Sequence, residues 1–453
     1  EEMKVSFENP DKINALLTIT VEEDDFKNDV EKTLKDYRKK ANMPGFRPGQ
    51  VPMGIIKRQY GSAVKMDAIN KLIGNEIQKY ITDNKIQMLG EPLASEKQEP
   101  QDLEKAAPYT FMFDIAVAPE FDVELTAKDK VDFYEIEVDD ALVDRQVEMF
   151  ASRSGKYETV EDYQEGDMLR GDLRELDEKG NTKEEGLTVE AAVLMPNYIK
   201  ADDQKKLFDG AKVGDIITFN PRKAYPESDA EVSSLLKIKK EEIAEHSGDF
   251  SYQITEIQRF QNHAVNQELF DKTFGEGEVK DEKEFRAKIA EGLEAQLATE
   301  SNYKFLLDLR KYAEDKVGQL TFPDALLKRI MKKNNEDKDQ EFIDKNYEPS
   351  IKELTWSLIR SKIVAQAGIK IEDEDVKQAA REAARAQFAQ YGMNNVPAEY
   401  VDNYAEDLLK KQETVQNFVD RAIDVKLIDA VKGTVKLNKK KISLDAFNKM
   451  MEE

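Results

Sequence analysis

The segment of residues 43–52, rich in proline and glycine, is the strongest constraint on how the first part of this 453-residue chain can fold. It contains three prolines, which exclude a regular helix because proline lacks the amide hydrogen and clashes with the preceding turn. Gly45 and Gly49 allow backbone angles that other residues resist. The segment therefore predicts a loop whose tip carries Phe46 and Arg47.

The charge around this loop is opposite in sign to that of the whole chain, whose formal net charge is −24. Residues 35–60 contain one acid, Asp36, and an excess of +6. The basic residues are Lys35, Arg38, Lys39, Lys40, Arg47, Lys57 and Arg58. From the loop alone, a plain helix-to-helix connection with Phe46 folded into the core is an equal alternative. The charge of the flanks favours an exposed tip that meets a polyanion or an acidic partner.

Composition excludes several classes of function. The chain has no cysteine, so we expect no disulfide, no thiolate nucleophile and a reducing, cytoplasmic location. His246 and His263 have no second imidazole at helix-face spacing, so we expect surface or loop positions and no metal site. No apolar run is long enough to span a bilayer, and the start of the sequence lacks the pattern of a secretory signal. No Walker-type glycine loop is present, so we expect neither ATP nor another cofactor.

Periodicity predicts a multidomain α+β protein with a helical C-terminal part. Strands are expected over 15–21 and 109–117, with helices from Phe26 to Tyr37 and from Ile55 to Ile81, the second ending near Asn84. Residues 119–155 read as a linker with a strand over 131–138 and a helix over 141–150. Residues 156–258 are strand-rich and punctuated by glycine. From 259 onward the spacing is helical, with a helix restarting at Phe322-Pro323-Asp324 and a hairpin turn over 392–397.

Read in order, these residues resemble the trigger factor family of ribosome-associated bacterial chaperones. The family's tip reads Gly-Phe-Arg-x-Gly-x-x-Pro and is followed by Arg/Lys-Tyr-Gly. The matching residues are Gly45, Phe46, Arg47, Gly49, Pro52, Tyr60 and Gly61. Pro48 stands where some members carry lysine, which removes one charge from the tip. The resemblance is strong over about the first 120 residues, recognisable in the helical part and poor in the middle.

The resemblance implies four segments. The first is a ribosome-binding α+β domain over 1–118, and the second is a linker over 119–155 that packs with the C-terminal domain. An FKBP-like α+β domain over 156–258 and an elongated, SurA-like helical chaperone domain with two arms over 259–453 follow. It implies an ATP-independent chaperone that binds the large ribosomal subunit at the tunnel exit through residues 45–49: Gly45, Phe46, Arg47, Pro48 and Gly49. Its other partners would be nascent and unfolded polypeptides, without a membrane, and a weak homodimer is left open.

The resemblance also implies prolyl isomerase activity, but the sequence lacks most of the pocket residues that this activity requires. Such an enzyme needs an aromatic pocket that holds the prolyl ring away from water. Leu173, Glu175, Lys200 and Asp202 stand where the family pattern places pocket residues or their glycine, so we expect these side chains to face water. Tyr225 is the one pocket residue that persists, while Phe250 and Tyr252 are expected in the core.

Client binding is expected on the helical part. An adaptable binder uses scattered methionine and aromatic side chains within a polar surround. The candidates are Phe388, Tyr391, Met393, Phe447 and Met450. Two other functions compete with the chaperone reading: an active prolyl isomerase that acts on unfolded proteins, and a SurA-like periplasmic chaperone. The absence of a signal pattern and the basic loop count against the second.

Overall fold

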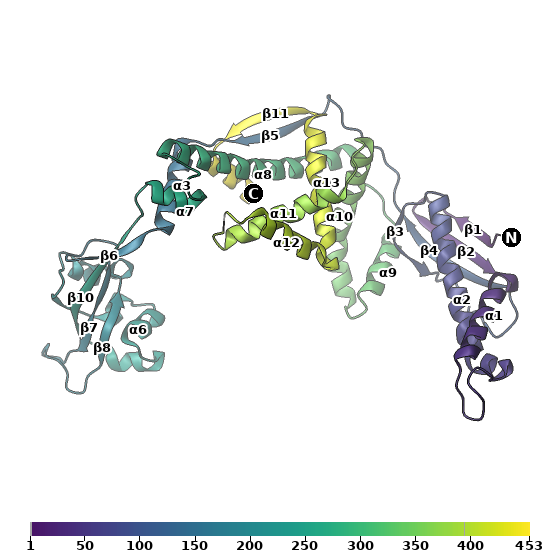
Figure 1. Cartoon of the computed structure of the whole chain (residues 1–453), viewed down its shortest axis with the longest axis horizontal. Helices are drawn as coiled ribbons and strands as arrows, with labels where there is room; N and C mark the ends of the chain where they lie inside the picture. The colour runs from purple at the N-terminus through teal and green to yellow at the C-terminus, as the bar shows by residue number, and fades with distance from the viewer. Residues whose placement is uncertain (1, 394) are drawn as a thin grey trace. The chain divides into compact units, whose positions relative to one another are not determined.

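The computed structural model describes residues 2–393 and 395–453, and the chain forms two compact units. The first contains the residues up to Phe133 together with Tyr303–Asp373 and Val419–Lys440. The second contains Tyr134–Asn302, Glu374–Phe418 and Lys441–Glu453. Each unit thus joins segments that are far apart in the sequence (Figure 1). The four-segment division expected from the sequence remains a prediction.

The first unit opens with an antiparallel sheet of four strands in the order β1-β2-β4-β3. The strands are β1 (Lys4–Glu8), β2 (Asn14–Val21), β3 (Met88–Ala94) and β4 (Tyr109–Val117). Alternate residues of β2 are buried, and Leu17, Ile19 and Val21 are fully covered, as in a strand with one face on a core. The strands expected over 15–21 and 109–117 are confirmed.

Two helices, α1 (Glu23–Lys40) and α2 (Met53–Asp83), supply the rest of this core. In α2, isoleucines at four-residue intervals make one buried stripe: Ile69, Ile73, Ile77 and Ile81. This spacing keeps them on one face of the helix. The helix ends at the C-cap residue Asn84, where the sequence indicated a break.

The helical core of the first unit is formed by α9 (Asp324–Asn334), α10 (Gln340–Gln366) and the parts of α8 (Glu282–Val317) and α13 (Gln412–Lys432) that belong to it. The helix expected after Phe322 is confirmed, since Pro323 is the N-cap residue of α9. The buried Asp129 accepts hydrogen bonds from Lys316 Nζ at 2.7 Å and from Tyr312 Oη at 2.6 Å. These bonds join α8 to the turn before β5 (Lys130–Ile136), which pairs with β11 (Lys436–Ile442).

The middle domain, in the second unit, is a five-stranded sheet in which β6-β10-β7-β8 follow one another and β9 pairs with β10. The strands are β6 (Lys156–Val160), β7 (Met168–Glu175), β8 (Thr188–Leu194), β9 (Ile216–Phe219) and β10 (Phe250–Gln261), with helices α4 (Asp202–Lys205), α5 (Pro221–Ala224) and α6 (Asp229–Leu236). The expected strand-rich character is confirmed. β10 continues past residue 258, where the sequence suggested that the domain ends.

Outside the middle domain, the helices of the second unit are α3 (Asp140–Arg153), α7 (Gln267–Phe274), α11 (Asp373–Gln390), α12 (Ala398–Leu409) and α14 (Leu444–Glu452), together with the remaining parts of α8 and α13. One cluster joins α3, α7 and α8 through Val143, Phe270 and Phe285, among others. The hairpin turn expected over 392–397 lies between α11 and α12; residue 394 is outside the described residues.

Candidate functional site

The loop between α1 and α2, residues 41–52, projects beyond the ends of both helices (Figure 1). The amide of Gly49 donates to the carbonyl of Ala41 at 3.1 Å and closes the loop. Gly45 and Gly49 have φ angles of +92° and +79°, in the left-handed region that favours glycine. The two glycines are therefore required by the backbone path that presents the tip.

The side chains at the tip are exposed. Phe46 keeps 40% of its surface accessible, and Arg47 and Pro48 are also exposed. The alternative in which Phe46 folds back into the core is therefore excluded. An exposed aromatic ring beside a guanidinium offers apolar contact and charge-assisted hydrogen bonds to a carboxylate or phosphate.

The base of the loop is held by buried groups. Val51 is fully buried in a cluster with Leu34 and Ile56, and its carbonyl accepts a hydrogen bond from Arg38 Nε at 2.9 Å. Arg38 is therefore part of the anchor of the loop. The remaining flanking basic residues are exposed: Lys35, Lys39, Lys40, Lys57 and Arg58.

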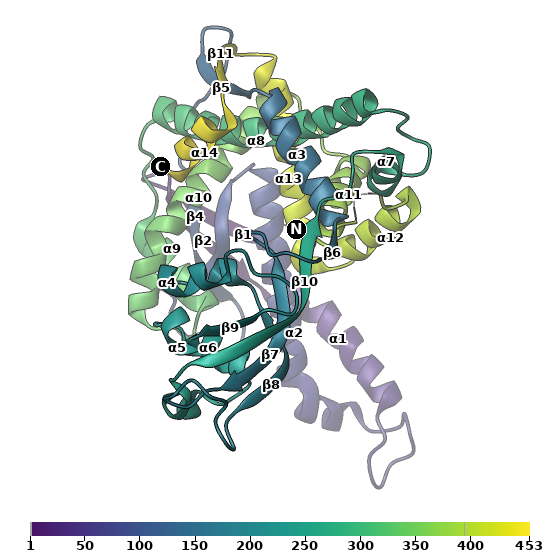
Figure 2. The same ribbon diagram turned by 90° about the vertical axis from the view of Figure 1, so that its left-hand side faces the viewer.

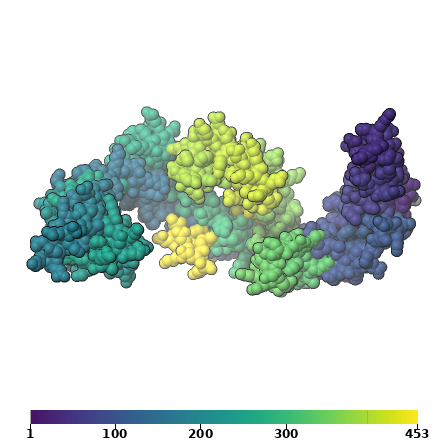
Figure 3. Space-filling model, turned by 90° about the horizontal axis from the view of Figure 1, so that it is seen from below, coloured from purple at the N-terminus to yellow at the C-terminus, as the bar shows by residue number. Residues whose placement is uncertain are grey.

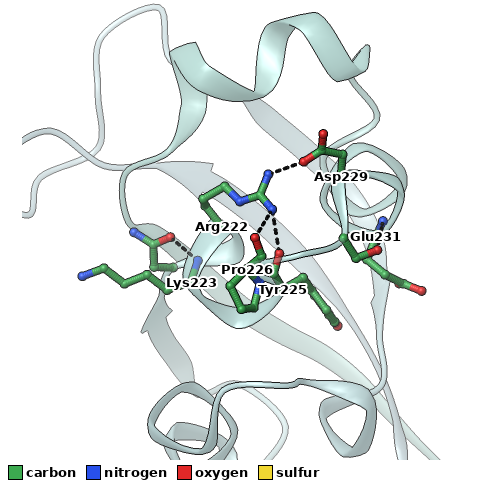
Figure 4. Close-up of polar contacts among 8 residues, drawn as sticks. Arg222, Lys223, Tyr225, Pro226, Asp229 and Glu231 are labelled. Carbon is green, nitrogen blue, oxygen red and sulfur yellow. Dashed lines mark hydrogen bonds and ion pairs between the residues drawn. The ribbon is translucent and has the colours of Figure 1, made fainter.

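Tyr225 follows α5 in the middle domain and is almost fully buried, with 4% of its surface exposed. Arg222 sets the local turn, as Figure 4 shows. One guanidinium nitrogen donates to Asp229 Oδ1 at 2.6 Å, and the other donates to the carbonyls of Tyr225 at 2.9 Å and Pro226 at 2.8 Å. Burial, and then the charge of Glu231, raise the pKa of Tyr225 to about 12, so its hydroxyl stays protonated at neutral pH.

Tyr225 lines a cavity of about 420 Å³. Tyr198, 64% exposed, also lines it, and Leu235 of α6 adds an apolar surface. Charged side chains complete the lining: Arg170, Glu231 and Lys237. The sequence indicated only Tyr225, because the other residues come from β7, β8, the turn after β8 and α6. No short spacing in the sequence joins them.

Two of the four residues expected to face water do not. Leu173 is fully buried and Glu175 is 4% exposed, because both point inward on the alternating strand β7. That expectation was wrong for this pair, whereas Lys200 and Asp202 are exposed as predicted. Phe250 and Tyr252 are fully buried in the domain core, as predicted.

The buried carboxylate of Glu175 has three partners. It accepts from the Leu187 amide at 2.9 Å, lies 2.9 Å from His246 Nδ1 and lies 3.5 Å from Lys183 Nζ. Burial acts to raise the pKa of Glu175, but the amide of Leu187 and the His246 ring outweigh it and lower this pKa. His246 is thus a half-buried structural partner at the end of a short 3-10 helix, and not the surface or loop residue that we expected. His263 is also half-buried and lies in a loop, as expected.

A groove of about 810 Å³ on the second unit is lined by α3, α7, α11, α12 and the turn between the last two. Phe388 and Met393, both expected to bind clients, lie in its wall with Tyr404, whose ring centroid is 5.4 Å from that of Phe388. The side-chain amide of Asn395 donates through Nδ2 to the Thr273 carbonyl at 2.7 Å and joins the turn to α7. Figure 2 shows α11 and α12 side by side, as Figure 1 does.

The other expected client residues lie outside this groove. Tyr391 is 75% exposed, and Met450 is half-buried on α14. Phe447 is only 1% exposed, so its assignment as a surface contact was wrong. It occupies the apolar face of the amphipathic helix α14, which packs inward. Tyr400, another aromatic residue of the helical part, also lines the groove, and the sequence missed Phe150 and Tyr404, which line it as well.

Family models match the chain in three consecutive stretches. "Bacterial trigger factor protein (TF)" matches residues 3–150, "Probable trigger factor, FKBP-like domain" matches 157–262, and "Probable trigger factor, C-terminal domain" matches 301–451. The chain belongs to the trigger factor family. The family resemblance inferred from the loop residues is thereby confirmed, as is the multidomain α+β fold.

Two curated relatives are similar to this chain over all or nearly all of its length. The trigger factor of Pelagibacter ubique (strain HTCC1062) is 22% identical, over 100% of this chain and 90% of its own. That of Chlorobaculum tepidum (strain ATCC 49652 / DSM 12025 / NBRC 103806 / TLS) is 22% identical, over 98% and 100%. A solved structure described as "Promiscuous Substrate Recognition in Folding and Assembly Activities of the Trigger Factor Chaperone" matches with a TM-score of 0.50 and 14% identity, over 95% of this chain and 99% of that one. It shows that the fold is that of a trigger factor.

Within residues 2–393 and 395–453, no cluster of three histidine or acidic side chains is placed to hold a metal ion. Over the same residues, none of the helices has the length and apolar character needed to cross a membrane.

Proposed function

We propose that this trigger factor is an ATP-independent, cytoplasmic chaperone that docks at the ribosomal exit tunnel through residues 45–49 and holds nascent polypeptides during early folding. The observation that supports docking is the exposed Phe46–Arg47 tip on a loop whose base is buried. A loop ordered before binding loses little conformational entropy when it binds. The exposed lysines around it supply a positive field in a chain whose net charge is −24.

Each tip residue has a separate role in this proposal. Phe46 would insert its ring into an apolar site, and Arg47 would donate charge-assisted hydrogen bonds to an acidic side chain or phosphate. Aromatic and arginine side chains at the centre of an interface typically carry most of its binding free energy.

Co-sedimentation with vacant ribosomes tests the docking site. Phe46→Ala combined with Arg47→Ala should weaken binding about 100-fold or more, since two central contacts are lost. Lys156→Ala with Tyr157→Ala is the matched control, because it also removes an exposed aromatic ring and a neighbouring cation. The circular dichroism spectrum should be unchanged in both. Undiminished binding by the loop variant would overturn the assignment.

Client holding is proposed for the helical part, with the groove containing Phe388 and Met393 as one contact surface. A variant lacking residues 156–261 tests this, because Lys156 and Gln261 are register partners and the ends of the excised segment are adjacent. The variant should still suppress aggregation of a refolding substrate. If it folds and loses all such activity, or if the excised domain alone carries the activity, the middle domain is the main client site.

Prolyl isomerisation is the second candidate function, and the cavity lined by Tyr225 and Tyr198 favours it. We expect a slow rate, because three charged side chains line the cavity and a bound prolyl ring would desolvate them. A protease-coupled peptide assay measures the rate. Activity typical of FKBP enzymes that is lost in Tyr225→Ala would establish an active isomerase instead.

A further inference from the structure

A groove of about 700 Å³ lies beside β3 and α9 in the first unit. Its apolar floor is formed by Leu93, Ala94 and Ala325, and its wall carries Lys328, Lys332 and Lys333. We call this feature the basic groove. In Figure 3 the green surface of the α9 region lies next to the blue surface of the N-terminal sheet.

The helix α9 is held rigidly on the sheet. Leu326 and Ile330 are buried against the residues of β3 and β4. Arg329 donates to Asp114 Oδ2 at 2.8 Å and to the Ala94 carbonyl at 3.2 Å. These contacts fix α9 on the sheet, and Lys332 and Lys333 of the same helix remain exposed at the groove.

The three lysines of the basic groove have no carboxylate partner within residues 2–393 and 395–453. Lys328 Nζ lies 5.0 Å from the centroid of the Tyr347 ring, and Lys332 Nζ lies 3.4 Å from the Lys338 carbonyl. Lys333 is exposed. Glu336 is the one acidic side chain in the described lining. The chain contains 92 acidic and 68 basic residues. The unpaired state of these lysines is therefore not explained by a shortage of carboxylates.

We propose that the basic groove binds acidic, partly apolar segments of client polypeptides. Flexible lysines can follow carboxylates at variable spacing, and their aliphatic stems with Leu93 and Ala94 can cover apolar side chains. Single-stranded RNA fits less well, because none of the described residues that line the groove is an aromatic on which a base could stack.

The basic groove would offset the repulsion between acidic client segments and a chain whose net charge is −24. Such a chain repels acidic segments that come within the Debye length, about 10 Å at moderate salt. A local positive site reverses this repulsion and lets the chaperone hold acidic clients. The inference rests on the proposed chaperone function, because the occupant is a client.

Fluorescence anisotropy of the full chain with two labelled peptides provides the test. One peptide alternates Asp or Glu with Leu and Val, and its counterpart carries Asn and Gln at the acidic positions. The acidic peptide should bind about fivefold more tightly at low salt and lose this advantage at high salt. Lys332→Gln with Lys333→Gln should remove most of the preference, while the neutral peptide binds as before. Lys410→Gln with Lys411→Gln is the matched control for exposed lysines elsewhere.

The outcomes separate this inference from the proposed function. Equal binding of the two peptides, or an unchanged preference in Lys332→Gln with Lys333→Gln, would overturn the basic groove as an acidic-segment site. Competition by single-stranded RNA at equal strength would also overturn it in favour of a nucleic-acid site. If neither peptide binds and aggregation is not suppressed, the chaperone function itself fails. Fluorescence of Trp356, the single tryptophan and a residue of the first unit, verifies that Lys332→Gln with Lys333→Gln is folded, and the circular dichroism spectrum verifies this for the control variant.

Discussion

The loop at residues 41–52 and the cavity around Tyr225 are both candidate binding sites, but they are built in opposite ways. Every group that forms the loop tip lies within a few residues, and prolines and glycines set its path. The cavity takes residues from two strands, a turn and a helix, so tertiary packing sets its shape. A locally encoded site tolerates changes in the rest of the protein, whereas a site assembled from distant segments depends on the whole domain.

Replacing one glycine of each region by alanine should give the largest difference between the two regions in the loss of stability. A Cβ at Gly171 would lie 2.4 Å from the Gln253 carbonyl oxygen and 2.6 Å from the Tyr252 ring, whose hydroxyl is held by the Ala192 carbonyl. We expect Gly171→Ala to destabilise the middle domain by about 3 kcal/mol. Gly45→Ala meets no atom within 4 Å but has a φ of +92°, so it should cost about 1 kcal/mol.

Hydrogen exchange of peptides from the middle domain, measured along a urea series, reports this effect. Trp356 fluorescence is unsuitable because that residue belongs to the other unit. A Gly171→Ala protein with unchanged exchange protection would show that the domain relaxes around the added carbon, and the contrast with the loop would then be lost.

Acid should weaken the middle domain through Glu175. Its pKa is lowered in the folded state by the Leu187 amide and the His246 ring despite burial, from an ordinary value of 4.5. The carboxylate therefore contributes stability above that ordinary value, and this contribution is lost as the pH falls through the lowered pKa. Glu175→Gln should cost about 2 kcal/mol at neutral pH and should flatten the pH dependence below 4.5. Urea unfolding at several pH values measures both.

The loop provides the internal comparison for this experiment, because residues 41–52 contain no acid. Ribosome binding by Glu175→Gln at neutral pH should equal that of the unchanged protein. Loss of binding in this variant would show that the two regions depend on each other.

The smallest expected effect is at the tip itself. Pro48→Lys adds one exposed charge beside Arg47 and should strengthen ribosome binding about twofold to fivefold at low salt, with little effect at high salt. Titration by co-sedimentation at two salt concentrations gives the change in affinity. Weaker binding at both would mean that the rigidity supplied by proline contributes more than the added charge.

Local patterns predicted much of this protein. In the first 120 residues, α1, α2, β2 and β4 lie close to their expected bounds, because alternation and four-residue spacing are local signals, whereas β1 and β3 were not expected. The exposure of Phe46 followed from proline, glycine and flanking charge. Tyr225 was found by family resemblance alone, and its neighbours Tyr198 and Leu235 were not found, since their proximity depends on pairing between distant strands.

The wrong predictions share one cause. Glu175 was expected to face water because a lone carboxylate is costly to bury, yet Leu187, His246 and Lys183 approach it from other parts of the chain. Phe447 was named as a client contact because of its aromatic side chain, and contacts of the apolar face of α14 bury it.

Three features could be predicted from the sequence alone: the family, the mixed fold and the loop that presents Phe46 and Arg47. Each of these depends on residue types at short spacing, where backbone sterics and local charge decide the outcome. The folded chain was needed to identify the lysines of α9 that border a groove, the residues that join Tyr225 in its cavity and the acids that are buried with partners. These depend on contacts between residues far apart in the chain, and close packing selects such contacts only when the whole unit has folded.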